Sequence, residues 1–342
     1  MRRIAGPIIA IALLTAACGG EPTGRVRLLT HESFSVSEEV LAAFSEETGY
    51  EVQILTGGDA GEIVNQAILA AGNPVADVLF GADTTFLSRA LEGGIFEVYE
   101  SPGLAVVAGE LRADPRVTPI DFGDVCVNYD KAAFGDLPAP ETLDDLADPA
   151  YAGMLVVENP ATSSPGLAFL LATIIRFGET GSYTWQDYWA DLRANDVQVA
   201  RGWEEAYYGV FSGGAGTGDR PLVVSYASSP PAEVIFATEP TDTAPTGVVP
   251  DGCFRQVEYA GILAGTDNQE AAEALIDFML SETFQEDIPL SMFVFPASSK
   301  AALPDVFIEH AVVPDAPLTM DPADIEEHRE RWIDEWTSIV LR

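Results

Sequence analysis

The sequence predicts an α/β protein built as two lobes, with the chain crossing between the lobes more than once. Its 342 residues are enough for two separate hydrophobic cores. Its first hundred residues alternate short apolar runs with stretches of helical periodicity, as strand-to-helix units do. The pattern changes character near residues 119–125, where we place the first crossing. A long strand-like run at 253–264 should then return the chain to the first lobe.

Acidic side chains dominate the charge of the chain. The 54 Asp and Glu residues outnumber the 17 Lys and Arg residues and give a formal net charge of −37. Nucleic-acid binding needs clustered basic groups to neutralise phosphates, so no nucleic-acid partner is expected. The acidity mainly keeps the surface solvated, and at 0.1 M salt it would steer a cationic ligand over only about 10 Å. Specificity for a ligand must therefore come from local groups.

The N-terminus has the pattern of an export signal. Two arginines precede an apolar run at 6–14, which is shorter than the roughly 20 residues of a membrane span. Small residues then lead to Cys18, in a pattern that resembles the bacterial lipobox, although Thr15 stands where that motif prefers Leu. We expect a lipoprotein signal peptide over 1–17, lipid attachment at Cys18 and a flexible tether over 18–24. The mature protein would be lipid-anchored in the periplasm or on the outer face of the cytoplasmic membrane.

The first lobe is expected at 25–121 and 256–300. It opens with three strand-to-helix units, whose strands are predicted at 25–30, 51–55 and 76–80. The carboxyl ends of parallel strands meet at one edge of a sheet, so the residues that follow them should face one cleft. Those residues are His31, Glu32 and Ser33, then Asp59 and Ala60 in a glycine-rich turn, then Asp83.

Helices are predicted where apolar residues recur at helical spacing between a capping residue and a stop. The first begins at Ser37 and ends at Gly49. Others are expected after Pro165, over 268–279 and over 325–340. We expect the last of these to belong to a C-terminal helical segment, 301–342, that packs on the two lobes.

The second lobe is expected at 122–255. Its strands are predicted at 121–129, 151–157, 197–200 and 222–224. Between the second and third of these, Ser163 or Ser164 could cap the next helix, with Pro165 at the first helical position. The cap alone would explain one serine. Two serines and free amides at a positive helix end could also hold a phosphate group.

The stretch 201–231 contains the strongest candidates for ligand binding. Trp203 follows one predicted strand, and Tyr226 stands where another should end. Core packing would explain either ring alone. Two large rings on separate loops could instead enclose a flat or cationic ligand. We expect the rings to meet across one groove, from opposite lobes.

Two cysteines remain once the lipid-attachment residue is set aside. An even pair in an exported protein predicts a disulfide between Cys126 and Cys253, and two separate buried thiols are the alternative. The bond would join the two strands that pass between the lobes.

Four stretches resemble the thiamine-binding members of the solute-binding proteins of ABC importers. They are TSSPG at 162–166, RGWEEAY at 201–207, VVSYASSP at 223–230 and GCFRQVEYAG at 252–261. The resemblance covers nearly the whole mature chain and implies a type II periplasmic-binding-protein fold. In that fold each lobe is a mixed sheet flanked by helices, and two hinge strands join the lobes. It further implies a monomer that captures thiamine or thiamine phosphate, needs no cofactor, and delivers its ligand to ABC permease and ATPase subunits.

The resemblance also assigns roles to residues. The aromatic residue that matches Tyr226 stacks on the pyrimidine, and those that match Ser164 and Trp203 hold the phosphate end. The turn matched by Asp59 and Ala60 contributes near that end.

The aromatic and acidic groups around these positions suit the same ligand. At Phe293 the family has a Trp within NWMYP, so the ring is kept but a weaker stacking partner is implied. Carboxylates at Glu32, Asp59 or Asp83 could offset the charge of the thiazolium ring.

Other functions stay open at this point. Paired tyrosines bind ferric iron in related importers, and Tyr207 and Tyr208 are adjacent, but neighbours in a helix point about 100° apart. A polyamine would also suit acidic and aromatic groups. No metal-ligand spacing, nucleophile elbow or phosphate-binding loop is present, so no metal and no catalytic residue is expected. Hydrolysis of a thiamine phosphate is the enzymatic alternative.

Overall fold

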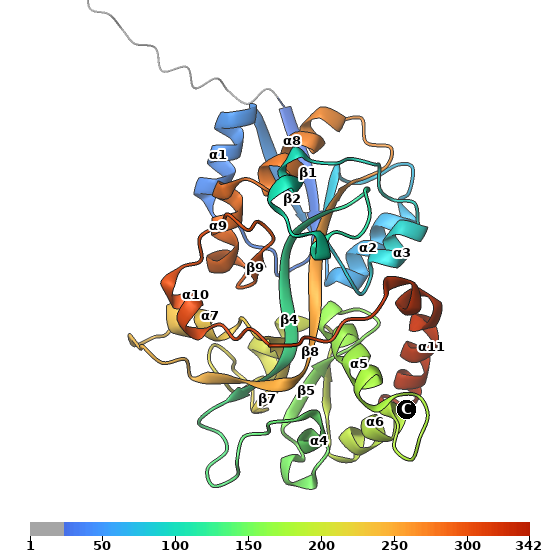
Figure 1. The fold of residues 1–342 in the computed structure, drawn as a ribbon, viewed down its shortest axis with the longest axis vertical. Helices are drawn as coiled ribbons and strands as arrows, with labels where there is room; N and C mark the ends of the chain where they lie inside the picture. Colours follow the sequence, from blue (N-terminus) through green and yellow to red (C-terminus); the bar gives the residue numbers. More distant parts are fainter. Residues whose placement is uncertain (1–23) are drawn as a thin grey trace, which may run out of the picture.

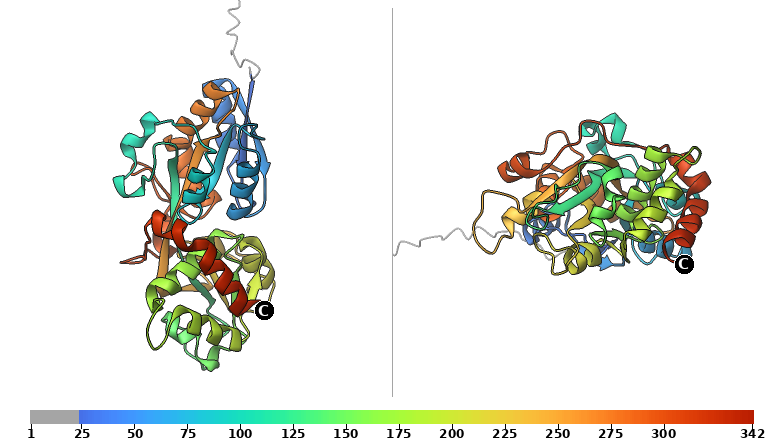
Figure 2. Two further views of the ribbon diagram at one scale, coloured as in Figure 1. Left: turned by 90° about the vertical axis from the view of Figure 1, so that its right-hand side faces the viewer. Right: turned by 90° about the horizontal axis from the view of Figure 1, so that it is seen from below.

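The computed structural model describes residues 24–342, so the expected signal peptide and Cys18 lie outside the described residues. Two lobes lie one above the other along the long axis, and strands β4 (Thr118–Asp130) and β8 (Thr246–Ile262) run between them (Figure 1). A view turned by 90° shows the two lobes stacked in the same way (Figure 2). Within residues 24–342 no helix is long and apolar enough to cross a membrane.

The upper lobe contains parallel and antiparallel strands. Strand β1 (Gly24–Thr30) pairs in parallel with β2 (Tyr50–Thr56) and β3 (Val78–Asp83), and β3 pairs antiparallel with β8. Its helices are α1 (Glu38–Thr48), α2 (Ala60–Leu69), α3 (Leu87–Glu92), α8 (Gln269–Met279) and α9 (Glu282–Ser291). Ser37 caps α1 by accepting from the Val40 amide, and Gly49 ends it at φ 76°, as predicted.

The lower lobe continues the same ladder of hydrogen bonds. Strand β7 (Leu222–Tyr226) pairs antiparallel with β4, and β5 (Leu155–Glu158) lies parallel between β7 and β6 (Gln198–Ala200). Its helices are α4 (Leu143–Leu146), α5 (Ser164–Phe177), α6 (Trp185–Ala194), α7 (Pro230–Ile235) and a π-helical turn at Glu205–Val210. Short 3₁₀ turns lie at Pro102–Val106 and Gly109–Leu111 in the upper lobe and at Pro149–Tyr151 in the lower lobe.

Two details of the lower lobe differ from expectation. The strand predicted at 151–157 begins only at Leu155, because Asp148 caps a 3₁₀ turn that includes Tyr151. The sheet of this lobe is also not separate. The strand order β2-β1-β3-β8-β4-β7-β5-β6 is continuous, since the two hinge strands pair with neighbours in both lobes.

A disulfide joins Cys126 on β4 to Cys253 on β8, which confirms the predicted pairing. It lies where the ladder between the two strands is interrupted: Val125 pairs with Phe254, and Val127 pairs with Val249. The bond therefore holds the two hinge strands together at a point where backbone hydrogen bonds are missing.

The C-terminal segment bridges the lobes. Helix α10 (Asp305–His310) contacts α7, and α11 (Pro322–Val340) packs against α6 of the lower lobe and α3 of the upper lobe (Figure 2). The buried indole of Trp336 meets that of Trp189 at 5.5 Å between ring centroids. The lobe boundaries given above stay a proposal, with 301–342 as the bridging segment.

Candidate ligand-binding site

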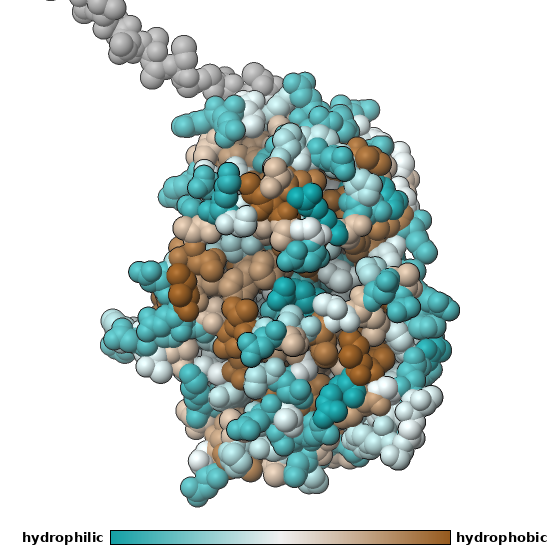
Figure 3. All heavy atoms as spheres, in the orientation of Figure 1, coloured by the Kyte–Doolittle hydropathy of each residue, from teal (hydrophilic) through white to brown (hydrophobic). Residues whose placement is uncertain are grey.

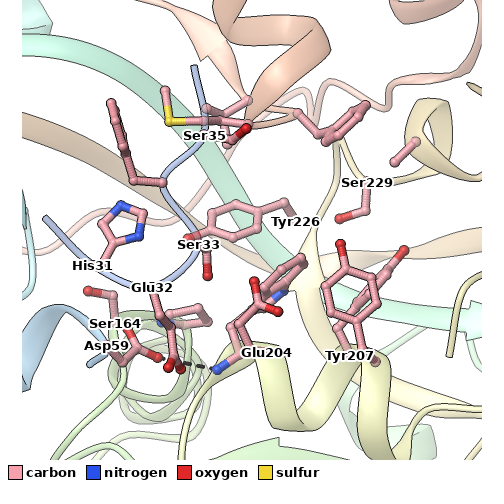
Figure 4. Close-up of a pocket in the computed structure, with 18 of the residues that line it drawn as sticks. His31, Glu32, Ser33, Ser35, Asp59, Ser164, Glu204, Tyr207, Tyr226 and Ser229 are labelled. Atoms are coloured by element: carbon pink, nitrogen blue, oxygen red, sulfur yellow. Dashed lines mark hydrogen bonds between the residues drawn. The ribbon is translucent and has the colours of Figure 1, made fainter. Parts of the chain in front are cut away.

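A cavity of about 330 Å³ lies between the lobes, beside the hinge strands. Its upper wall comes from the loop after β1 and the start of α2, and its lower wall from the residues after β6 and β7 and from α7 (Figure 4). A volume of this size is typical of sites for small organic ligands. Phe236 lines the cavity yet is 65% exposed, so the cavity opens to solvent beside α7.

Tyr226 lines the cavity at the end of β7, and its position depends on the strand next to it. A side chain at Gly123 of β4 would place its Cβ 2.7 Å from the Tyr226 ring, so glycine is needed for the ring to lie against the hinge. The Tyr226 hydroxyl donates to Gln256 Oε1 at 3.1 Å. One side of the ring is thus fixed against β4 while the ring contributes to the cavity wall (Figure 4).

Trp203 also lines the cavity and is fixed at both of its nitrogen atoms. Its indole Nε1 donates to Ser225 Oγ at 2.9 Å, and its backbone amide donates to Asp59 Oδ2 at 3.2 Å. Tyr207 stacks on its ring at 4.9 Å between centroids. Trp203 and Tyr226 therefore line one cavity.

The expectation that these two rings come from opposite lobes is wrong. Trp203 follows β6 and Tyr226 ends β7, and both strands belong to the lower lobe. The rings that do meet across the opening are Phe293, after α9, and Phe236, after α7, at 5.6 Å between centroids. Phe293 lines the cavity with a left-handed backbone at φ 57°, which turns the chain between α9 and β9 (Phe295–Pro296).

Five carboxylates line the cavity, and they belong to Glu32, Asp59, Glu204, Glu233 and Glu258. No Arg or Lys lines it. Burial raises the pKa of Glu32 and of Glu204, and in each case negative neighbours raise it further. The basic groups nearby are His31, whose Nε2 lies 3.3 Å from Glu258 Oε1, and the exposed Arg201, 3.9 Å from Glu32. This arrangement favours a cationic ligand.

The starts of helices α2 and α5 face each other across the cleft. Asp59 accepts from the Ala60 amide at 2.7 Å and thereby caps α2, and the next amide, that of Gly61, donates to the Thr162 carbonyl at 3.1 Å. A Cβ at Gly61 would lie 2.9 Å from that carbonyl, so only glycine allows this approach. Together with the bond from Trp203 to Asp59, these contacts join the lobes at one end of the cavity.

The serine pair before α5 behaves only partly as predicted. Ser163 occupies the N-cap position, but its side chain makes no capping hydrogen bond. Ser164 is the first residue of α5 and lines the cavity beside Asp59 (Figure 4). Ser163, the residue before α5, is fully buried and does not line the cavity.

Asp83 does not line the cavity either. It is fully buried and accepts from the Thr85 hydroxyl at 2.8 Å and from the Phe86 amide. Burial, with the adjacent Glu258, raises the pKa of Asp83 to about 7. Its register neighbour Glu258 reaches the cavity instead, and Asp121, the partner of Glu258 on β4, is also buried with a raised pKa.

Several lining residues were not chosen from the sequence as part of the thiamine site. Tyr207, considered above only as an iron ligand with Tyr208, belongs to the π-helical turn and donates its hydroxyl to Glu233 Oε1 at 2.6 Å. Glu204, Gln256 and Glu258 line the cavity as well. The sequence offered a signal for Glu204, which directly follows Trp203, whereas Gln256 and Glu258 lie in a strand whose register decides their direction.

Comparison with known proteins identifies the family. Residues 73–313 match the family described as bacterial extracellular solute-binding protein. This chain belongs to that family. The chain is similar to proteins named thiamine-binding periplasmic protein. One from Salmonella typhimurium is 30% identical with 92% of each chain covered, and one from Escherichia coli is 29% identical with 97% of this chain and 98% of the other covered.

A solved structure confirms the expected fold. A structure titled periplasmic thiamin binding protein superimposes with a TM-score of 0.83, at 26% identity, over 93% of this chain and 96% of the other. The two-lobe α/β fold with a mixed sheet flanked by helices is therefore the fold of this chain.

Proposed function

We propose that this chain is an exported lipoprotein that captures thiamine between its lobes and delivers it to an ABC importer. The observation that carries the proposal is one cavity that combines the rings of Tyr226 and Trp203 with five carboxylates. Thiamine joins a flat aminopyrimidine to a permanently cationic thiazolium, so aromatic faces and negative charge suit both rings. The thiamine-binding names of the relatives support this choice.

The proposed roles follow the positions in the cavity. Tyr226 stacks on the pyrimidine, and Phe293 covers the ligand at the opening. Glu32 and Asp59 offset the thiazolium charge. The hydroxyethyl end lies near Ala60, Ser164 and Trp203. Asp83 and Ser163, which lie behind the wall, support it from outside the site.

The proposed cellular setting rests on the sequence. Signal cleavage before Cys18 and its acylation would anchor the protein to the membrane, leaving residues 18–24 as a tether. The protein would act as a monomer outside the cytoplasm and pass its ligand to the permease and ATPase subunits of the importer. No nucleic acid or cofactor takes part.

The iron and hydrolase alternatives fit the geometry less well. The Tyr207 hydroxyl donates a hydrogen bond to Glu233. The rings of Tyr207 and Tyr208 are nearly perpendicular, so the two hydroxyls do not converge on one metal. For a hydrolase, the serines after β7 are poorly placed as nucleophiles, because Ser229 shares a hydrogen bond with Ser225 and Ser228 is fully buried. A polyamine suits the carboxylates but leaves the aromatic faces without a flat partner.

Calorimetry and fluorescence test the proposal together. We expect thiamine to bind with a submicromolar Kd and to quench tryptophan emission, with spermidine and ferric citrate as comparison ligands. Of the five tryptophans, all within residues 24–342, only Trp203 lines the cavity, whereas the other four are buried elsewhere. The quenching should disappear in Trp203→Phe. A titration of the unaltered protein that gives no heat with thiamine or its phosphates would refute the proposal.

A further inference from the structure

Two phenylalanine rings from different lobes flank the opening of the cavity. Phe236 directly follows α7 of the lower lobe, and Phe293 comes shortly after α9 of the upper lobe. The two helices lie on the same side of the molecule, one in each lobe (Figure 1). The ring centroids are 5.6 Å apart with the planes at 73°, which is the edge-to-face geometry that aromatic pairs favour. The two rings therefore connect the lobes at the opening.

Two kinds of contact join the lobes around the cavity. At the starts of α2 and α5 the contacts are hydrogen bonds, from the Gly61 amide to Thr162 and from the Trp203 amide to Asp59. At the opening the contact is between two apolar rings, so its separation leaves no hydrogen-bonding group without a partner. Because the cavity opens to solvent beside α7, a ligand that leaves passes this aromatic pair.

The ring of Phe236 contributes little to the core of the protein. It is 65% exposed, and within residues 24–342 Phe293 is the one aromatic ring that it meets. Helix α7 is held by other contacts, because α10 packs on it and Glu233 accepts from the Tyr207 hydroxyl. Replacement of the Phe236 ring should therefore leave the fold intact.

Phe293 occupies a backbone conformation that suits glycine better. Its amide and that of Met292 both donate to the Ile288 carbonyl, at 3.2 and 2.9 Å, and this ends α9 with Phe293 at φ 57°. L side chains are uncommon in this left-handed region, so the ring at 293 is present at a local cost in backbone energy. Strain of this kind gathers at functional sites, which indicates that the ring acts on the ligand and not only on the fold.

We propose that Phe236 and Phe293 form an aromatic gate that closes over the captured ligand and slows its release, with Phe236 as the half that the lower lobe supplies. This inference rests on the proposed function for the identity of the ligand. The two rings also keep water away from the carboxylates inside the cavity. Attraction between opposite charges is stronger where water is excluded, so the gate retains a cation without carrying a charge itself.

Stopped-flow measurement of Trp203 emission with thiamine gives the rate constant of binding, and the calorimetric Kd then gives that of release. We expect Phe236→Ala to release thiamine about three to ten times faster, because the two rings no longer pair over the ligand. The rate constant of binding should change less than about twofold, because the rings are already apart when the ligand enters. Phe236→Tyr keeps the ring and should release thiamine at the rate of the unaltered protein.

Two further variants make the test specific. Ile235→Ala removes the neighbouring exposed apolar side chain on α7, which does not line the cavity, and should leave both rate constants unchanged. Phe293→Ala should speed release as Phe236→Ala does. Addition of Phe236→Ala to Phe293→Ala should then speed release less than about twofold more, because the partner ring is already missing.

The outcomes separate the gate from the proposed function. Release from Phe236→Ala at the unaltered rate, or an equal acceleration in Ile235→Ala, would overturn the gate while leaving thiamine capture in place. Effects of the two phenylalanine substitutions that multiply fully would overturn the pairing of the rings. If the unaltered protein does not bind thiamine, the proposed function fails, and a gate over thiamine fails with it.

Discussion

At the scale of residues, the site depends on the close packing of Tyr226 against the hinge strands. The ring lies against β4 only because position 123 has no side chain, and its hydroxyl is held by Gln256 of β8. Tyr226 therefore contacts both hinge strands. A ligand stacked on it would lie against the two strands that connect the lobes.

Substitution of Tyr226 tests whether the ligand stacks on this ring. Tyr226→Ala should weaken thiamine binding at least about tenfold, because stacking and cation contacts of an aromatic ring contribute about 0.5 to 2 kcal/mol and a cavity would replace the ring. Tyr226→Phe keeps the ring but loses the hydrogen bond to Gln256. Its Kd for thiamine should lie within a few-fold of that of the unaltered protein. Calorimetry measures both. An unchanged Kd in Tyr226→Ala would remove the residue from the site.

At the scale of elements, β4 and β8 carry the connection between the lobes. They form the longest pairing in the sheet, interrupted where β8 bulges between Val249 and Phe254. The disulfide crosses that interruption, and neither cysteine lines the cavity. The bond should therefore stabilise the fold with little direct effect on ligand binding.

Removal of the disulfide gives the corresponding prediction. The cysteines are 127 residues apart, and closing so long a loop restricts the unfolded chain, so Cys126→Ser with Cys253→Ser should lower the free energy of unfolding by about 2 to 5 kcal/mol. Urea unfolding measures this, and the thiamine Kd should change less than about threefold. A reductant should destabilise the unaltered protein but not the double variant. Alkylation of two thiols in the unreduced, unaltered protein would contradict the bond.

At the scale of the whole molecule, the lobes meet through acidic groups that are costly to ionise. Burial raises the pKa of Asp59 and Glu204, and that of Asp83 to about 7. Burial lowers the pKa of His31, but Glu258, Asp59 and Asp83 outweigh it and the net shift is upward. Each of these groups binds its proton more tightly in the folded state than in the unfolded chain.

The upward direction of these pKa shifts determines how the stability of the folded protein depends on pH. A raised folded pKa contributes stability at low pH, and this contribution is lost as pH rises through the folded pKa. We therefore expect the melting temperature of the ligand-free protein to fall between pH 5.5 and pH 8, the range that includes the Asp83 value of about 7. A bound cation favours the ionised carboxylates, so thiamine should raise the melting temperature more at pH 8 than at pH 5.5. Thermal melts across this range measure both effects, and a flat or rising ligand-free profile would contradict the argument.

An apolar patch lies on the surface beside the cavity. Apolar side chains gather over α7 and α10, where the exposed large hydrophobic residues include Phe236, Ile308 and Val313 (Figure 3). Phe236 lines the cavity opening as well. The opening is therefore bordered by apolar surface, whereas the five carboxylates lie inside the cavity.

The succession of strands and helices along the chain, the caps of α1 and the cysteine pairing could be predicted from the sequence because each depends on a local or simple pattern. Ser37 and Gly49 delimit α1 through their own backbone and side-chain preferences. The alternation of strands and helices predicted the α/β class, and the cysteine pair followed from export. Trp203 and Tyr226 could be chosen because strand ends in such sheets face the cleft.

Tertiary structure alone decided which groups face the ligand. Register paired Asp83 with Glu258 on one face of the sheet, where Glu258 reaches the cavity but Asp83 is enclosed by Thr85 and Phe86, and Ser164 lines the cavity whereas Ser163 does not. Topology placed Trp203 and Tyr226 in the same lobe and left Phe293 and Phe236 to meet across the opening. The physical reason is that a local pattern sets the conformation of its own segment, whereas the direction of a side chain near a cleft depends on pairing between segments distant in the chain.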